Sequence, residues 1–259
     1  MQDFAMGRWL LFLAYGTSVV GSTVGLACTL QARHASTDRR RLGWLALAAL
    51  SIGGVGIWLM HFIAMLGFAT PGMPVRYDIS RTVLSAVLAV VAVFAGLLVL
   101  GGRAKFAWWR LIVGGLITGI AVNVMHYTGM WAVRVRGTWT YNPALVALSV
   151  VIAVVAATVA LWFSVSIAKP LYRFLAGLVM GVAVTGMHYT GMAAVELHLD
   201  MSAPDPAGVE VFSFLFPVFV LAAVALVVPV SAVLMASPAK PQPPARTPAH
   251  EPPVTIDAR

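Results

Sequence analysis

Long apolar runs alternate with short polar connections along the whole chain. The runs are each about 20 residues or longer, which suffices for a helix to cross the hydrocarbon core of a bilayer. There are seven, at about 9–30, 42–68, 79–100, 108–133, 143–166, 172–195 and 211–235. The pattern therefore predicts an all-α bundle of seven transmembrane helices within residues 1–235, surrounded by lipid.

Composition and charge fit a membrane protein and add an orientation. Hydrophobic residues make up 60% of the 259 positions and charged residues only 10%, whereas about a quarter of an average soluble domain is charged. With the N-terminus outside, 12 Lys and Arg fall on the cytoplasmic side and 5 on the outer side. Basic residues beside transmembrane helices favour the cytoplasm. We therefore expect the C-terminus inside, and interpret the net charge of +8 as a membrane signal with no role for nucleic acid.

One hexapeptide recurs in the chain. MHYTGM occupies 125–130 and again 187–192, and the related MHFIAM occupies 60–65. Its histidines, His61, His126 and His188, are 65 and 62 residues apart, and each lies in the second helix of a helix pair. Asp78 and Asn142 recur at the start of the helices that follow, as expected of N-caps. These features predict three helix-pair repeats followed by a seventh helix.

The repeat predicts how the second, fourth and sixth helices pack. They run in the same direction, so their histidines share one depth, about 10 Å from the outer helix ends. Seven residues before each histidine is a glycine (Gly54, Gly119 and Gly181), and three residues after it is a small residue. Small residues let membrane helices approach closely. We expect these three helices to pack together through the glycine stripe, with their inner ends nearly touching and an outer chamber above.

The chamber would contain histidine and methionine side chains. A histidine inside a membrane suggests a function by default, although inter-helix hydrogen bonding alone is the alternative. Imidazole suits copper, zinc, iron and nickel, while thioether sulfur selects Cu(I). The candidate ligands are His61, His126, His188, the methionines four residues later (Met65, Met130, Met192) and those one residue earlier (Met60, Met125, Met187).

These ligands need not all bind. The later methionines lie about 6 Å further along their helices, so either a subset of ligands binds one ion or two layers form. The earlier methionines fit packing or lipid contact slightly better than metal binding. Asn123 and Thr185, three residues before a histidine, are expected to orient the imidazoles. His198, near Glu196 in an acidic outer loop, is a weaker candidate for recruiting metal.

With these motifs, the chain resembles the MHYT domain of bacterial membrane signalling proteins. The resemblance covers about 9–235, with two full motifs at 125–128 and 187–190 and a degenerate first copy at 60–63. It implies a cytoplasmic-membrane sensor of oxygen, carbon monoxide or nitric oxide that binds copper through the motif residues. Family members are often fused to cyclic di-GMP enzymes, kinases or DNA-binding domains.

The end of the chain bears on the output. Residues 236–259 are rich in proline and are expected to form a disordered cytoplasmic tail. No output domain is recognisable there, so we expect any signal to pass through a separate cytoplasmic protein or through the tail itself. The sequence shows no catalytic motif, which argues against an enzyme. Three alternatives stay open. The protein could be a copper carrier, a haem protein with two of the histidines as axial ligands, or a bundle in which the histidines only form hydrogen bonds between helices.

Overall fold

The computed structural model describes residues 9–68, 74–101 and 106–236, and within them seven helices are long and apolar enough to cross a membrane. This confirms the predicted number and approximate position of the spans. The spans are α1 (Trp9–His34), a composite second span, α4 (Ile79–Leu100), α5 (Trp108–Ala132), α6 (Pro143–Ser166), α7 (Pro170–Ala193) and α8 (Val211–Met235). The predicted tail lies outside the described residues, apart from Ala236.

The second span contains three helical segments in series. It begins as α2 (Asp38–Ala49), continues as a π-helix, η1 (Leu50–Leu59), and ends as α3 (Met60–Met65). In a π-helix the backbone hydrogen bonds skip one residue more than in an α-helix, and such segments are rare and short. The apolar pattern gave no sign of this change of helix type.

Local sequence sets where several spans begin. The Asp78 side chain accepts a hydrogen bond from the backbone N–H of Arg81 at the start of α4. Asn142 accepts from the N–H groups of Ala144 and Leu145 at the start of α6. Both predicted N-caps are thus confirmed, and they satisfy N–H groups that have no partner inside the helix.

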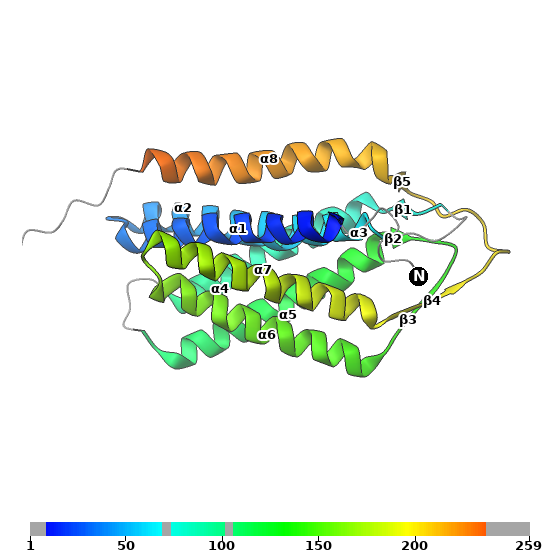
Figure 1. The fold of residues 1–259 in the computed structure, drawn as a ribbon, viewed down its shortest axis with the longest axis horizontal. Coiled ribbons are helices and arrows are strands. Elements are labelled where there is room, and N and C mark those ends of the chain that lie inside the picture. The colour runs from blue at the N-terminus through cyan, green and yellow to red at the C-terminus, as the bar shows by residue number, and fades with distance from the viewer. Residues whose placement is uncertain (1–8, 69–73, 102–105, 237–259) are drawn as a thin grey trace, which may run out of the picture.

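Six of the spans form a ring, and the seventh lies outside it. Contacts run from α1 to the second span, then to α4, α5, α6 and α7, and back to α1. The three histidine-bearing spans therefore alternate with α1, α4 and α6. The last helix, α8, packs on α1 and η1, and Figure 1 shows it along one side of the bundle.

The prediction that the glycine stripes pack against one another is wrong. A Cβ on Gly119 would lie 2.4 Å from the Val154 Cα of α6, and one on Gly181 would lie 2.8 Å from Val19 Cγ2 of α1. The glycines thus admit the neighbouring helix of the ring. The inner ends of the three spans do not meet, because an apolar cavity of about 50 Å³, lined from η1, α4, α5, α6 and α7, lies inside the ring.

The packing glycine of the second span also differs from the prediction. A Cβ on Gly53 would lie 2.5 Å from the Ala89 carbonyl oxygen and 2.9 Å from Val90 Cα, both on α4. A Cβ on Gly54 would make only ordinary contacts, at 3.5 and 3.6 Å. Gly53, and not Gly54, therefore corresponds to Gly119.

Short strands gather at one end of the bundle, so the prediction of an all-α chain is also incomplete. β1 (Arg76–Tyr77) pairs antiparallel with both β2 (Val133–Arg134) and β5 (Val209–Glu210), and β3 (Gly137–Tyr141) pairs with β4 (Val195–Leu199). The segments that follow the three histidine-bearing spans leave the ring together, and their backbones can pair there. We call this the strand end (Figure 1).

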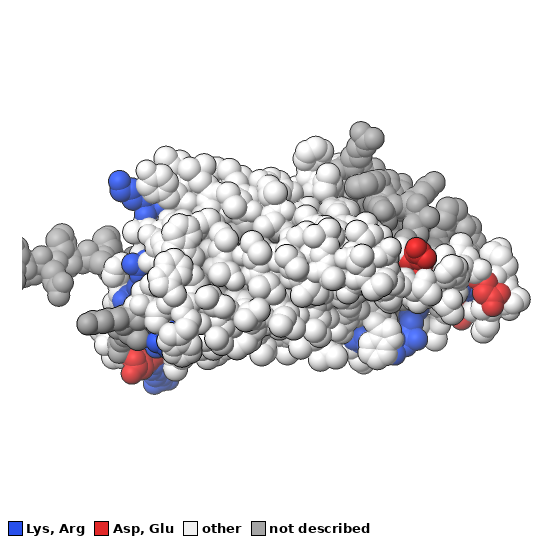
Figure 2. Space-filling model, turned by 90° about the horizontal axis from the view of Figure 1, so that it is seen from below, with Lys and Arg blue, Asp and Glu red and all other residues white. Residues whose placement is uncertain are grey.

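Among the described residues, charged side chains lie near the two ends of the helices. Figure 2 shows a broad band without Lys, Arg, Asp or Glu between them, as expected of a surface that faces lipid. At the strand end, Arg76 pairs with Glu210 at 2.8 Å and Arg134 pairs with Asp78 at 3.0 Å. The Arg134 guanidinium, together with the N–H of Arg81, holds the pKa of the Asp78 carboxyl below its usual range.

We predict that Gly119→Ala destabilises the protein by about 1–3 kcal/mol, because the added methyl group meets backbone atoms of α6 that must move. Gly186→Ala is the matched control: nothing lies within 4 Å of its added Cβ. It should be neutral or stabilise by up to about 1 kcal/mol through helix propensity. Thermal unfolding in detergent measures both, and equal effects would contradict the proposed packing.

We also predict that the ion pairs of Asp78 contribute stability that acid removes. Because its folded-state pKa is lowered, the contribution is complete above the unfolded value of about 3.9 and is lost as the pH falls through the lower folded value. Asp78→Asn keeps an N-cap but removes the charge. Its unfolding temperature should fall less than that of the native protein between about pH 5 and pH 2. Parallel curves would contradict this.

Candidate metal centre

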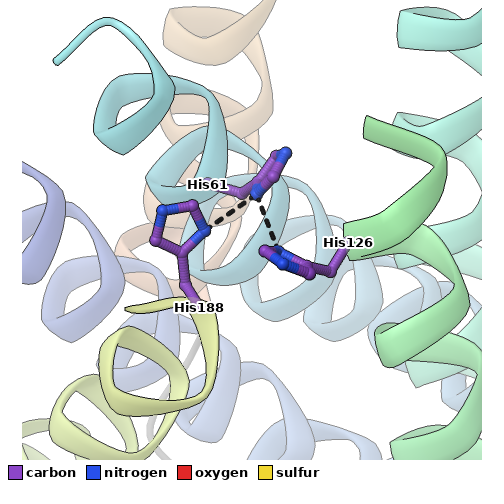
Figure 3. Close-up of side chains that lie close together, drawn as sticks. All are labelled: His61, His126 and His188. Carbon is purple, nitrogen blue, oxygen red and sulfur yellow. Dashed lines mark hydrogen bonds between the residues drawn. The ribbon is translucent and has the colours of Figure 1, made fainter. Parts of the chain in front are cut away.

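The three repeated histidines meet inside the ring near the strand end. His61 comes from α3, His126 from α5 and His188 from α7, and all are buried, with 4%, 0% and 1% of their surface exposed. Their Nδ1 atoms converge: His61 lies 3.0 Å from His188 and 3.2 Å from His126 (Figure 3). Among the described residues, no other group of three or more His, Cys, Asp or Glu side chains is as suitably placed for a metal ion.

The cluster has nearly three-fold geometry. The ring centroids are 5.0, 5.0 and 5.1 Å apart, and each pair of rings meets edge to face at 77° to 87°. The equal spacing fits the repeat, because the three histidines belong to the same hexapeptide on alternate spans of the ring. The common depth predicted from the sequence is therefore confirmed as a common meeting point.

The glycines three positions after the second and third histidines make room for an imidazole of another repeat. A Cβ on Gly129 would lie 2.4 Å from His61 Nε2, and one on Gly191 would lie 2.3 Å from His126 Nε2. Each glycine of the hexapeptide thus accommodates the ring of another repeat. The sequence signal was visible, but its partner was not, because that partner lies more than 60 residues away.

The tyrosines of the motif support the imidazole rings. Tyr127 packs edge to face on His126 and Tyr189 on His188, each with ring centroids 4.9 Å apart. The Tyr127 hydroxyl also lies 3.1 Å from the Ser149 hydroxyl of α6. This contact was not predicted from the sequence, although the tyrosine directly after the histidine in two of the repeats is a signal that could have found it.

Neither of the two expected orienting residues, Asn123 and Thr185, is hydrogen-bonded to an imidazole. The Asn123 side chain donates a hydrogen bond to Ser149 Oγ at 3.1 Å, and Trp58, at the same place in the first repeat, donates to Ser85 Oγ at 3.0 Å. Thr185 Oγ1 is buried without a hydrogen-bond partner. Asn123 therefore anchors α5 to α6 and does not hold an imidazole, because three residues before the histidine a side chain faces the adjacent helix.

All six candidate methionines are buried, between 1% and 4% exposed. Burial excludes direct lipid contact for Met60, Met125 and Met187, and Met187 lines the apolar cavity. Met65, Met130 and Met192 lie one helical turn nearer the strand end than the histidines. His198 is apart from the cluster, exposed on β4 with its Nε2 3.1 Å from Thr140 Oγ1.

The cluster cannot satisfy its own hydrogen bonds. A neutral imidazole carries one N–H, on either Nδ1 or Nε2. The Nδ1 atoms are so close that one proton can lie between them, and a second proton on another Nδ1 would be repelled by the first. Two rings must then carry the proton on Nε2, yet the Nε2 atoms of His126 and His188 are buried without a partner. When all three rings carry the proton on Nε2, three Nδ1 lone pairs face one another, an arrangement that suits a cation.

The spacing also suits a cation bound by three nitrogens. With metal–nitrogen bonds of about 2.0 Å, three ligands in a plane have nitrogens about 3.5 Å apart, and the observed separations of 3.0 and 3.2 Å need only a small expansion. The described residues of the cluster supply imidazole only, with neither thiolate nor carboxylate. The residues present thus fit a metal that favours nitrogen and tolerates neighbouring thioether sulfur.

Comparison with known proteins identifies the fold family. The model of a bacterial signalling protein N-terminal repeat, named MHYT, matches residues 54–114, 119–177 and 181–240, which together exceed half the chain. The chain belongs to the MHYT family. The first two matched segments each contain one whole span, α4 or α6, flanked by parts of two histidine-bearing spans, and the third contains the end of α7 followed by α8. The family unit is therefore offset from the helix pairs expected from the sequence.

Curated MHYT relatives are larger signalling proteins. The chain is 42% identical over 167 residues to the bifunctional diguanylate cyclase/cyclic di-GMP phosphodiesterase MucR of Pseudomonas aeruginosa, which covers 62% of this chain and 24% of the relative. It is 31% identical over 225 residues to the signalling protein YkoW of Bacillus subtilis, an alignment that covers 81% of this chain and 28% of YkoW. The cyclic di-GMP phosphodiesterase NbdA of P. aeruginosa is 36% identical over 215 residues, an alignment that covers 79% of this chain and 26% of NbdA.

The chain thus spans about a quarter of the length of these relatives. No solved structure matches it. Seven membrane-spanning helices and membership of the MHYT family make it a multi-pass membrane protein with a signalling role.

We predict that Gly129→Ala destabilises the protein through His61, and Gly191→Ala through His126, because each added methyl group overlaps an imidazole. The two single variants should each lose about 1–3 kcal/mol. His61→Ala should suppress most of the effect of Gly129→Ala and leave that of Gly191→Ala unchanged, and His126→Ala should do the reverse. A double-mutant cycle on thermal unfolding measures the coupling. Equal coupling for matched and crossed pairs would contradict the geometry.

Proposed function

We propose that this MHYT protein is a membrane sensor whose input site is the three-histidine cluster, and that the cluster binds copper. The observation that carries the proposal is the convergence of three buried Nδ1 atoms, at 3.0 and 3.2 Å, without enough protons or partners to satisfy them. Membership of a signalling family supports the sensor role.

Copper is favoured by the side chains around the cluster. Three imidazoles suit several transition metals, but six buried methionines in the neighbouring positions favour Cu(I) over zinc or iron. Met65, Met130 and Met192 lie between the cluster and the strand end, where a soft metal ion would enter. The three histidines are the proposed ligands, and the methionine sulfurs are proposed to receive the ion or complete its coordination.

The distribution of charge supports a cluster near the outer face of a bacterial cytoplasmic membrane. Among the described residues, seven Lys and Arg lie at the end opposite the strands and four at the strand end, and basic residues favour the cytoplasmic side. The strand end would then face outward and the end of α8 would lie in the cytoplasm. A copper site near the outer face is reached without crossing the membrane.

The proposed stimulus is a small diatomic gas, such as oxygen, carbon monoxide or nitric oxide, or a change in redox state. A metal held by three protein ligands retains room for one more. The apolar cavity of about 50 Å³ reaches Met187, the residue before His188, and could admit a small apolar gas. Copper would supply the bond to that gas, while the protein's own residues orient the imidazoles and exclude water from them.

The observations favour a sensor over the other candidate functions. A carrier would need a polar path through the inner half of the ring, but the cavity there is lined mainly by Ile, Val, Leu, Ala and Met. A haem cannot lie between imidazoles whose Nδ1 atoms are 3.0 Å apart. The enzymatic activities named for the relatives are theirs as whole proteins. We propose that the signal passes to a cytoplasmic output protein at the end of α8.

We predict about one copper per chain in the purified protein, measured by mass spectrometry of bound metals after loading with Cu(I). The triple variant of His61, His126 and His188 to Ala should lose it. His198→Ala is the matched control, since His198 is exposed on β4, and it should bind copper like the native protein. Folded native protein that binds no copper, or a triple variant that still binds it, would contradict the proposal.

A further inference from the structure

The apolar cavity inside the ring lies next to the histidine cluster, on the side away from the strand end. Its lining includes Ile57, Val122 and Val184, each of which comes four residues before a clustered histidine. Four residues are about one helical turn, so these three side chains form a layer between the cavity and the cluster. Met187, directly before His188, also lines the cavity. A molecule in the cavity is therefore about one turn away from the site.

The cavity suits a small apolar guest. Two hydroxyl groups line it, but both donate hydrogen bonds to backbone carbonyl oxygens, Ser164 to Leu161 at 2.6 Å and Thr118 to Ala92 at 3.3 Å. Apolar cavities without free polar groups stay dry and take up guests such as xenon. A water-sized molecule needs roughly 10–15 Å³, so a cavity of about 50 Å³ has room for a diatomic gas molecule.

A second apolar hollow, of about 330 Å³, lies on the outside of the ring between α6 and α7. Its lining includes Val151, Val155 and Val179, whose exposed fractions are 57%, 58% and 52%. These residues lie near the middle of both helices. The hollow, which we call the α6–α7 groove, therefore opens toward lipid near the middle of the membrane.

One layer of side chains separates the groove from the cavity. Ala156 of α6 and Met180 of α7 line both hollows. Ala156 contributes only a methyl group. Met180 is 4% exposed and has an unbranched, flexible side chain. The thickness of the wall between lipid and cavity therefore depends mainly on the rotamer of one methionine.

The same place in the preceding repeat is closed. When α4 is aligned with α6 on their N-caps, and α5 with α7 on their histidines, Ala92 corresponds to Ala156 and Thr118 to Met180. Between α4 and α5, the Thr118 hydroxyl donates to the Ala92 carbonyl oxygen at 3.3 Å. A Cβ on Gly96 would lie 2.0 Å from the Thr118 hydroxyl oxygen, so these two helices are in close contact.

Two differences in α6 account for the thinner wall between α6 and α7. Ala160 holds the position of Gly96, and its methyl group prevents an equally close approach of the two helices. Ala157 holds the position of Val93, and its smaller side chain leaves space on the cavity side. Both alanines line the cavity. The repeat is therefore modified at the one seam where the cavity comes close to lipid.

We propose that the α6–α7 groove is the entrance by which a small apolar gas passes from the lipid into the cavity beside the histidine cluster, and that Met180 controls its passage. The entrance rests on the proposed function, because it is the path by which the stimulus would reach that site. Apolar gases dissolve better in hydrocarbon than in water, since opening a cavity in water costs free energy. The gas is therefore most concentrated where the groove opens. Charged molecules are excluded, because the lining offers them no partner.

Dissolved oxygen, which is paramagnetic, tests whether the cavity takes up gas without any metal. In metal-free native protein with isotope-labelled methionine methyl groups, oxygen should speed the NMR relaxation of the Met187 methyl several-fold more than that of Met60 or Met125. All three methionines are buried and directly precede a histidine, but of the three only Met187 lines the cavity. Equal enhancement at the three methyl groups would overturn the proposal.

Exchange of xenon between lipid and cavity tests the route. Saturation-transfer xenon NMR measures it on metal-free protein in lipid nanodiscs. Ala156→Phe thickens the wall and should slow the exchange by about tenfold or more, because a small rise in the barrier has that effect. Met180→Ala thins the wall and should speed the exchange. Ala147→Phe, at an exposed position of α6 that lines neither hollow, is the matched control and should exchange like the native protein.

The opposite directions of the two effects distinguish a route from general destabilisation, which would speed exchange in both variants. Unchanged exchange in folded Ala156→Phe and Met180→Ala would overturn the route. Equal slowing by Ala156→Phe and Ala147→Phe would also overturn it.

Carbon monoxide separates failure of the route from failure of the copper proposal. In Cu(I)-loaded protein, its binding rate should fall in Ala156→Phe and rise in Met180→Ala, in parallel with xenon exchange, while the copper content stays the same. Equal binding rates in all the proteins would mean that gas reaches the cluster by another path, and would overturn the route. Absence of carbon monoxide binding, with xenon exchange still following the two variants, would refute the copper proposal alone.

Discussion

The meeting of three imidazoles at one point within an apolar bundle is the constraint on which the rest of this structure depends. Each ring must leave its own helix, enter the centre and pass the backbone of another span at the same depth. Glycine at 129 and 191 is required for the last step, because a methyl group there would overlap His61 or His126. The six-helix ring supplies the symmetry that makes the three approaches equivalent.

Packing around the ring follows from a second constraint, the close approach of neighbouring helices. Glycines on the histidine-bearing spans admit the backbone of α4, α6 and α1, and polar pairs such as Asn123–Ser149 and Trp58–Ser85 join the same neighbours. The centre is then left to larger apolar side chains and a small cavity. The same contacts therefore stabilise the bundle and shape the site, because the contacts that close the ring also fix the depth of each imidazole.

Hydrophobic periodicity and the recurring hexapeptide predicted the seven spans, their N-caps and the common depth of the histidines. They could not assign partners to the glycines, because a stripe of small residues looks the same whichever helix it faces. Asn123 was wrongly expected to orient an imidazole for the same reason, because the sequence does not show which neighbouring helix its side chain faces. The strands were missed because they are short and form only where distant segments meet. The π-helix was hidden because Gly53 and Gly54 are adjacent, and seven-residue spacing selected the wrong one.

X-ray absorption at the copper edge on the Cu(I)-loaded native protein tests the central claim most directly, because it reports the atoms bonded to the metal. The account predicts a copper site with about three nitrogen ligands near 2.0 Å and the scattering pattern of imidazole rings. Replacing any one of the three histidines should reduce the nitrogen count. A site dominated by sulfur, or one with no imidazole signature, would contradict a copper ion held by His61, His126 and His188.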